Sequence, residues 1–311
     1  MTGTPIAEEA PVAPNPTFAT FWAGPPLSPY ERACLGSFTR QGYELTLYSF
    51  ERYDDLPPGV RLADAAEITP RSDLELFRYG AKPDLSHFSD YFRYALFRAT
   101  DHVWIDSDVF LVRPFDIALP PTLLTKEHAT SLCGAIMRID RRELDLDAVI
   151  ARTRGLAGRP LRWGETGPLL LTDLFGASKL MEVAYEPKHF YPVLYDVFWR
   201  VFLPEERDAC AEACRDAYTL HLWNNIVVQL GIWKQLAPPS GSYLHELFAE
   251  AGMLEAFSGT YPADVMRRMI DNWRLRFTGS DVGVGNLVRQ LLPGALRTAR
   301  RRGWIRPADH A

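Results

Sequence analysis

The chain has 311 residues, of which 47% are hydrophobic and 12% aromatic, and its formal net charge is -5. This composition is too apolar for a disordered polymer and suffices for a sizeable core in one large or two smaller domains. The acidic balance argues against a general nucleic-acid-binding protein.

Two features of the sequence bear on the compartment in which the protein works. No apolar run approaches the length of a membrane span, and the N-terminus lacks the basic and apolar regions of a secretory signal. The cysteines show neither a Cys-x-x-Cys pair nor a metal-ligand spacing, which favours buried free thiols in a reducing compartment. They are Cys34, Cys133, Cys210 and Cys214. We therefore expect a cytoplasmic protein.

The first elements follow the chain in strand–helix–strand order. Residues 1–16 are rich in Pro, Ala and Glu and predict a disordered tail. Residues 17–22 predict a strand, residues 29–41 an amphipathic helix, and residues 43–50 a second strand. Several Pro and Gly residues between 54 and 84 predict loops around short elements.

The middle of the chain continues the alternation. A strong helix is predicted from Ser86, its expected N-cap, to Thr100. A short apolar strand at 103–105 follows, and the apolar pattern resumes at 109–112. Further expected elements are a strand at 131–139, a helix at 141–154, a strand at 218–222 and a helix at 225–236. Strands alternating with helices indicate an α/β fold with a mostly parallel central sheet.

We expect one such domain at 17–240 and a helical C-terminal extension at 241–311. Between Asn286 and Pro307 the chain carries six arginines and no acidic residue, with apolar residues interleaved. Such a segment can bind weakly to an anionic membrane surface. The alternative is a helix packed on the domain with its arginines in solvent.

Asp106 and Asp108 form the first candidate site. They follow an apolar strand, and residues two apart point the same way in an extended chain, so both carboxylates are expected to converge. Ligands of open α/β sheets bind beyond the carboxyl ends of the strands. Two carboxylates there suit a hard divalent cation, which would be bound both by them and by the oxygens of a diphosphate. The alternative is an ordinary strand-to-turn junction, because Asp is common in turns.

Several motifs stand in an order that resembles a known family. Phe88-Ser-Asp-Tyr-Phe-Arg93 precedes Trp104-Ile-Asp-Ser-Asp-Val109, and Phe21-Trp22-x-Gly24 lies at the first strand. Gly164-Glu-Thr-Gly-Pro168 and His221-Leu-Trp-Asn224 follow later. Together they resemble the DXD glycosyltransferases of the GT-A fold, in particular the sugar-binding-region transferases of polysaccharide and outer-chain mannan synthesis. The glucosylating toxins are more distantly similar.

The resemblance implies transfer of a sugar from a nucleoside-diphosphate sugar to a glycan or glycolipid acceptor, with retention of anomeric configuration. It implies that Mn²⁺ or Mg²⁺ is held by Asp106, Asp108 and His221; an imidazole ligand suits Mn²⁺ better. It also implies catalytic roles for Asp90 and Arg93 on ribose and sugar hydroxyls. The remaining donor-site residues that it implies are Trp22 against the base, Ser107, Thr166, Gly167 and Asn224.

Plainer interpretations of the same residues stay open. Asp90 and Arg93 are spaced as a surface salt bridge, Trp22 can be a core aromatic residue, and His221 can be a hydrogen-bonded core histidine. Phe21 is expected in the core, because neighbours on a strand point to opposite faces.

Two other functions are compatible with the scaffold. One is a non-catalytic nucleotide-sugar or glycan-binding protein, against which the intact D-x-D argues. The other is a metal-dependent nucleotidyltransferase, against which the absence of an early Gly-rich phosphate loop with Arg or Lys argues.

Overall fold

A computed structural model of the chain describes residues 15–79, 82–159 and 161–277, together with 291, 293–296 and 298–299. The expected N-terminal tail, apart from its last two residues, lies outside the described residues, and so does most of the basic C-terminal segment. In the part of the chain that is described, the helices are too short or too polar to cross a membrane.

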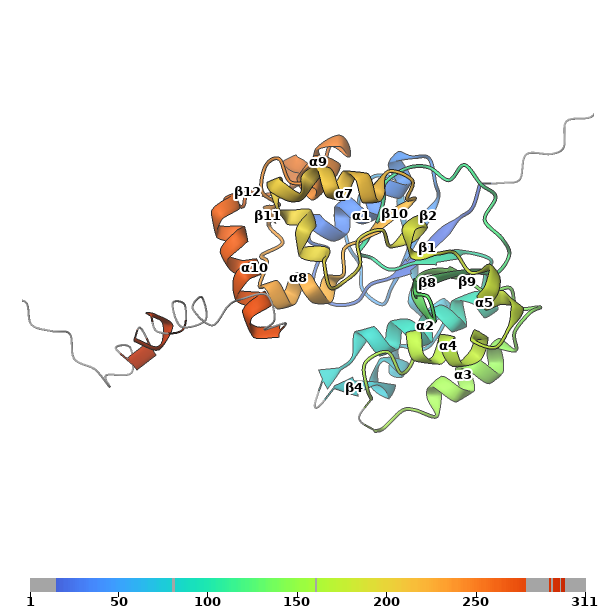
Figure 1. The fold of residues 1–311 in the computed structure, drawn as a ribbon. Coiled ribbons are helices and arrows are strands. Elements are labelled where there is room, and N and C mark those ends of the chain that lie inside the picture. Colours follow the sequence, from blue (N-terminus) through green and yellow to red (C-terminus); the bar gives the residue numbers. More distant parts are fainter. Residues whose placement is uncertain are drawn as a thin grey trace, which may run out of the picture.

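A six-stranded sheet in the order β3-β2-β1-β6-β9-β8 forms the centre of the molecule (Figure 1). The strand β1 pairs in parallel with β2 and β6, β2 pairs in parallel with β3, and β9 runs antiparallel to β6 and β8. The strands are β1 Phe18–Phe21, β2 Leu45–Ser49, β3 Val60–Asp64, β6 Val103–Ile105, β8 Leu123–His128 and β9 Ser131–Arg138. The predicted α/β class with a mostly parallel central sheet is confirmed.

Alternate residues of the central strands pack into two hydrophobic clusters, because successive side chains point to opposite faces of a sheet. Phe18 and Ile105 belong to one cluster, and Ala19 and Trp104 to the other. The first is covered by α1 (Pro29–Arg40), α9 (Tyr243–Glu250) and α10 (Ala263–Phe277). The second is covered by α2 (Leu85–Ala99), α3 (Leu146–Arg154) and α4 (Pro168–Phe175). Figure 1 shows α1 and α9 on one side of the sheet and α2, α3 and α4 on the other.

Shorter elements complete the fold. The antiparallel ribbon of β7 and β10 places His221 opposite Val109. β11 and β12 pair in parallel, so the chain on either side of residue 240 shares one small sheet and one core cluster. These elements are β4 Arg78–Tyr79, β5 Lys82–Pro83, β7 Val109–Leu111, β10 Thr219–His221, β11 Leu236–Ala237, β12 Gly259–Thr260, α5 Lys179–Val183, α6 Pro187–Phe190, α7 Arg207–Cys214 and α8 Asn224–Leu230. Short 3-10 helices span Ala65–Glu67, Arg71–Leu76, Phe198–Phe202, Pro204–Glu206 and Leu254–Ala256.

Three predicted helix boundaries were wrong for local reasons. Asp84, and not Ser86, caps α2, because its carboxylate accepts hydrogen bonds from two backbone N–H groups of the first turn. α3 begins at Leu146, since Asp145 caps it through the Ala148 N–H. α8 ends at Leu230, because Gly231 takes the left-handed conformation with φ 74°.

The four cysteines are buried and form no disulfide. Burial raises the pKa of Cys133 and of Cys214 to about 12 and that of Cys210 to about 11. Thiols this weakly acidic carry almost no thiolate and are poor nucleophiles, which fits the prediction of buried structural thiols.

Candidate functional site

The site lies where two parallel strands end side by side. Trp22 follows β1 and Asp106 follows its neighbour β6, at the carboxyl edge of the sheet. β1 also has β2 on its other flank, so β1 and β6 mark the point where the strand order reverses. Trp22 is half-buried, and its indole N–H donates to the Pro25 carbonyl at 2.8 Å. Phe21 is a core residue as predicted, packed on the rings of two phenylalanines of α2.

Asp106 to Asp108 form a turn and not the extended segment that the sequence predicted. The Val109 N–H donates to the Asp106 carbonyl at 3.1 Å, which closes the turn. The side chains converge nevertheless, because β7 leads directly away from the turn and pairs with β10, which ends at His221. One ligand atom from each of Asp106, Asp108 and His221 lies within 4.8 Å of the other two. Ser107 occupies the middle of the turn and is half-buried.

Asp108 is held in its ionised form. Its carboxylate lies 3.2 Å from His221 Nε2 and accepts the backbone N–H of Asn224 at 2.7 Å. Burial works against ionisation, but the charge of His221, these two hydrogen bonds and the charge of Lys234 lower the pKa of Asp108 to about 2. Asp108 is therefore available as an anionic ligand at neutral pH.

Trp223 adopts the left-handed conformation, with φ 45° and ψ 61°, which is rare for any residue other than glycine. Its indole N–H donates to the Val193 carbonyl at 3.0 Å, and its ring centroid lies 4.1 Å from that of His221. This strained residue turns the chain so that the next N–H points at Asp108. Strain of this kind costs on the order of 1–3 kcal/mol and concentrates at functional sites.

The residues present fit a divalent cation. His221 Nδ1 and Asn224 Oδ1 are buried and have no hydrogen-bond partner in the described part of the chain. Buried polar atoms are nearly always paired, so two orphans beside two carboxylates need an explanation. A divalent cation with mixed oxygen and imidazole ligands accounts for this donor set.

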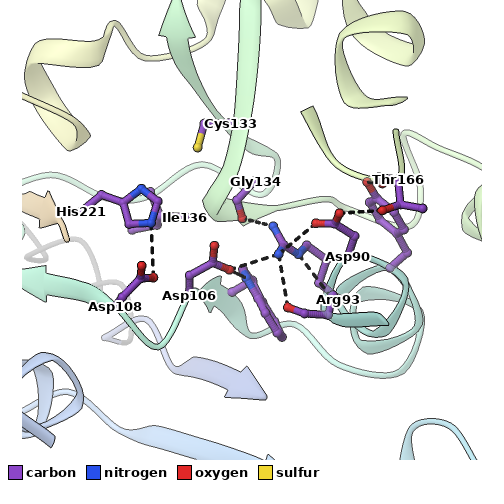
Figure 2. Close-up of polar contacts among 12 residues, drawn as sticks. Asp90, Arg93, Asp106, Asp108, Cys133, Gly134, Ile136, Thr166 and His221 are labelled. Atoms are coloured by element: carbon purple, nitrogen blue, oxygen red, sulfur yellow. Dashed lines mark hydrogen bonds and ion pairs between the residues drawn. The ribbon is translucent and has the colours of Figure 1, made fainter. Parts of the chain in front are cut away.

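A buried chain of polar side chains extends the site toward α4 (Figure 2). The Arg93 guanidinium lies 3.1 Å from the carboxylates of both Asp90 and Asp106, and it also donates to the Gly134 carbonyl. Asp90 in turn accepts the hydroxyl of Thr166 at 2.7 Å. Arg93 is only 4% exposed and Asp90 is buried, so the surface salt-bridge interpretation was wrong.

Two glycines make room for this chain. A Cβ on Gly167 would lie 2.7 Å from an oxygen of Asp90, and a Cβ on Gly134 would collide with the Arg93 guanidinium. Gly167 is also the N-cap residue of α4. Burial raises the pKa of Asp90, and Arg93 and Thr166 oppose this rise. The close packing fixes the geometry of both charged groups.

One ion pair of the site was missed by sequence reasoning. Lys234 pairs with Glu31 of α1, and both lie near Asp108 and Asn224. Glu31 also accepts the Ser28 N–H at 3.0 Å in a capping box. The sequence pattern around Ser28 signals a helix start but carries no sign of a partner 203 positions away.

No protein-family model matches the chain, and no curated protein matches it significantly. Among solved structures, the chain is similar to one titled "PaToxG Glycosyltransferase", with 14% sequence identity and a TM-score of 0.39. The match covers 51% of this chain and 67% of that chain. A likeness of this degree says nothing about the activity of this chain.

Proposed function

We propose that the protein is a metal-dependent glycosyltransferase with a nucleoside-diphosphate sugar as its donor. The observation that carries the proposal is the continuity of two groups: Asp106, Asp108 and His221 on one side, and the buried Arg93–Asp90–Thr166 chain on the other. The first group suits a cation, which in turn suits a diphosphate. The Arg93–Asp90–Thr166 chain offers charged hydrogen-bonding groups next to the cation ligands, as the binding of a polyhydroxylated sugar requires.

Each residue has a definite task in this proposal. Asp106, Asp108 and His221 hold the cation, which when bound neutralises the negative charge of the diphosphate leaving group. Asp90 accepts hydrogen bonds from sugar or ribose hydroxyls, and Arg93 holds that carboxylate in place. Thr166 and Gly167 lie beside the sugar, Asn224 beside the diphosphate, and Trp22 against the base. The sequence resemblance supports this assignment, together with a glycan or glycolipid acceptor and retention of configuration.

The test is turnover of donor by the purified chain. UDP-glucose, UDP-galactose, UDP-N-acetylglucosamine and GDP-mannose are incubated with the protein and Mn²⁺, and release of the nucleoside diphosphate is measured. We expect release from at least one donor, and its loss in EDTA. Binding of a donor without turnover in the presence of sugar acceptors would support the non-catalytic nucleotide-sugar-binding protein instead. Release of pyrophosphate from a nucleoside triphosphate would indicate a nucleotidyltransferase.

A further inference from the structure

Glu127 is a buried carboxylate that the site described so far does not use. It lies near the end of β8, and its side chain is only 6% exposed. Within the described residues no hydrogen bond reaches its carboxylate, and its one ion-pair partner, His128 Nε2, is 4.0 Å away. The carboxylate keeps only a small contact with solvent, and this partial loss of hydration disfavours its charged form. A position that retains such a cost is a candidate for a functional role.

The strand register places Glu127 at the carboxyl edge of the sheet, on the same edge as Asp106. Asp106 donates its N–H to Ala135 of β9 at 2.7 Å, and the hairpin of β9 and β8 continues past that point. In this hairpin Lys126 pairs with Leu132 and His128 with Ser131, so Glu127 is an extra residue in a β-bulge. Bulges occur near active sites, where they redirect a side chain.

A row of aromatic rings joins Glu127 to the cation ligands. The His221 ring packs on the Trp223 ring, whose centroid lies 6.0 Å from that of Tyr195. The Tyr195 centroid lies 6.1 Å from that of His128, the residue next to Glu127. Tyr195 is 42% exposed and the side chain of His128 is 47% exposed. The row therefore presents aromatic rings to solvent between the cation site and the carboxylate. We call these four rings the aromatic row.

Glu127 interacts electrostatically with His221 of the cation site. Burial raises the pKa of Glu127, and the charges of His128 and His221 oppose this rise. A carboxylate with a raised pKa is a stronger base than an exposed one, and proton transfer is most efficient when that pKa approaches the working pH.

We propose that Glu127 receives the acceptor: its carboxylate accepts a hydrogen bond from the attacking hydroxyl group and takes its proton during sugar transfer. The hydroxyl oxygen forms a bond to the anomeric carbon of the donor on the face from which the diphosphate leaves, so configuration is retained, and the bond from that carbon to the diphosphate oxygen breaks. The electron pair of the broken bond leaves with the diphosphate, and the proton passes from Glu127 to solvent. The aromatic row packs against a carbohydrate-like acceptor, whose C–H faces are apolar.

This inference rests on the proposed function, and water serves as the smallest acceptor in its test. Release of nucleoside diphosphate is measured with Mn²⁺ and the donor that the wild-type protein uses. Glu127→Gln keeps the shape of the side chain but cannot take a proton. We expect turnover to fall by about 10²- to 10⁴-fold, the usual contribution of a general base, with unchanged binding of UDP and Mn²⁺.

The matched control is Glu186→Gln, which removes the carboxylate that pairs with Lys126 of the same strand at 2.6 Å. Its turnover should equal that of the wild type. A stability measurement separates a structural role from a chemical one. Because Glu127 lacks hydrogen bonds, Glu127→Gln should unfold at the wild-type temperature or above, whereas a structural role predicts a lower one. Added formate should partly restore turnover to Glu127→Ala, because it supplies the missing base.

Three outcomes are decisive. Turnover lost in Glu127→Gln, kept in Glu186→Gln and restored by formate supports the assignment. Wild-type turnover in Glu127→Gln overturns it and leaves the glycosyltransferase proposal intact. A wild-type protein that turns over none of the donors overturns both.

Discussion

The guanidinium of Arg93 lies 3.1 Å from the carboxylate of Asp106, although 13 residues separate them along the chain. Arg93 comes from the middle of α2 and Asp106 from the end of β6, the next strand after that helix. This ion pair connects the cation ligands directly to the proposed sugar-binding residues. A substitution at Arg93 should therefore affect both.

We expect Arg93→Ala to lose donor use and also to destabilise the fold, by about 3–5 kcal/mol, because it leaves the buried Asp90 carboxylate and the partly buried Asp106 carboxylate without their cationic partner. Arg93→Lys keeps the charge but not the fork of donors that spans Asp90 and Asp106, so it should recover stability more than turnover. Urea unfolding and donor turnover measure the two effects. If Arg93→Lys has wild-type turnover, the guanidinium geometry does not matter for function.

Gly167→Ala should show whether the position of the Asp90 carboxylate matters for turnover, because it leaves the charge of Asp90 in place. Its new Cβ would lie 2.7 Å from a carboxylate oxygen of Asp90, so Asp90 must move away from Thr166. Misplacement of a binding group by about 1 Å can cost roughly 10²-fold in rate, and we expect a loss of that order. Gly36→Ala in α1 is the control, because its Cβ would make only ordinary contacts of 3.5 Å or more. Equal turnover in the two variants would argue against a role for Asp90.

His87 predicts a pH dependence of stability. Its ring lies between the Asp84 carboxylate, at 2.6 Å, and the Arg162 carbonyl, at 3.2 Å. Both partners are acceptors, so both ring nitrogens must carry protons. Burial disfavours this cation, but the hydrogen bonds to Asp84 and Arg162 outweigh burial and raise the pKa of His87.

A raised pKa in the folded state means that the contribution of His87 is complete below its unfolded pKa, about 6.5. It is lost as the pH rises through the higher folded pKa. Chemical unfolding on either side of this window should show wild-type stability falling with rising pH, because the charged hydrogen bonds of His87 are lost. His87→Gln should show a smaller slope. Parallel slopes would mean that His87 is neutral in the folded protein.

The sequence predicted the elements whose pattern is local. β6 was predicted with its observed bounds, because an apolar run between a helix and Asp106 leaves little choice. β8 was missed, since four of its six residues are polar or charged and its burial depends on pairing with β9. A local sequence pattern does not reveal a strand whose burial depends on a pairing partner elsewhere in the fold.

The candidate site shows the same limit. Asp106, Asp108 and His221 were expected near one another, and they are, although through a turn and not an extended strand. Glu127 carried no motif, and its position depends on a bulge in a strand that was not predicted. The Lys234–Glu31 pair likewise depends on the packing of α1 against a loop far along the chain.

Direct measurement of Mn²⁺ binding tests the central claim most directly. Electron paramagnetic resonance of free Mn²⁺ is recorded during titration with the wild-type protein, Asp108→Asn and Asp173→Asn, each with and without UDP. Asp173 is the control, because its carboxylate is exposed and pairs with Arg152 on the surface. The account predicts one bound Mn²⁺ per chain with UDP for the wild type and Asp173→Asn, and none for a folded Asp108→Asn. Equal Mn²⁺ binding by Asp108→Asn, or no binding by the wild type with UDP present, would contradict it.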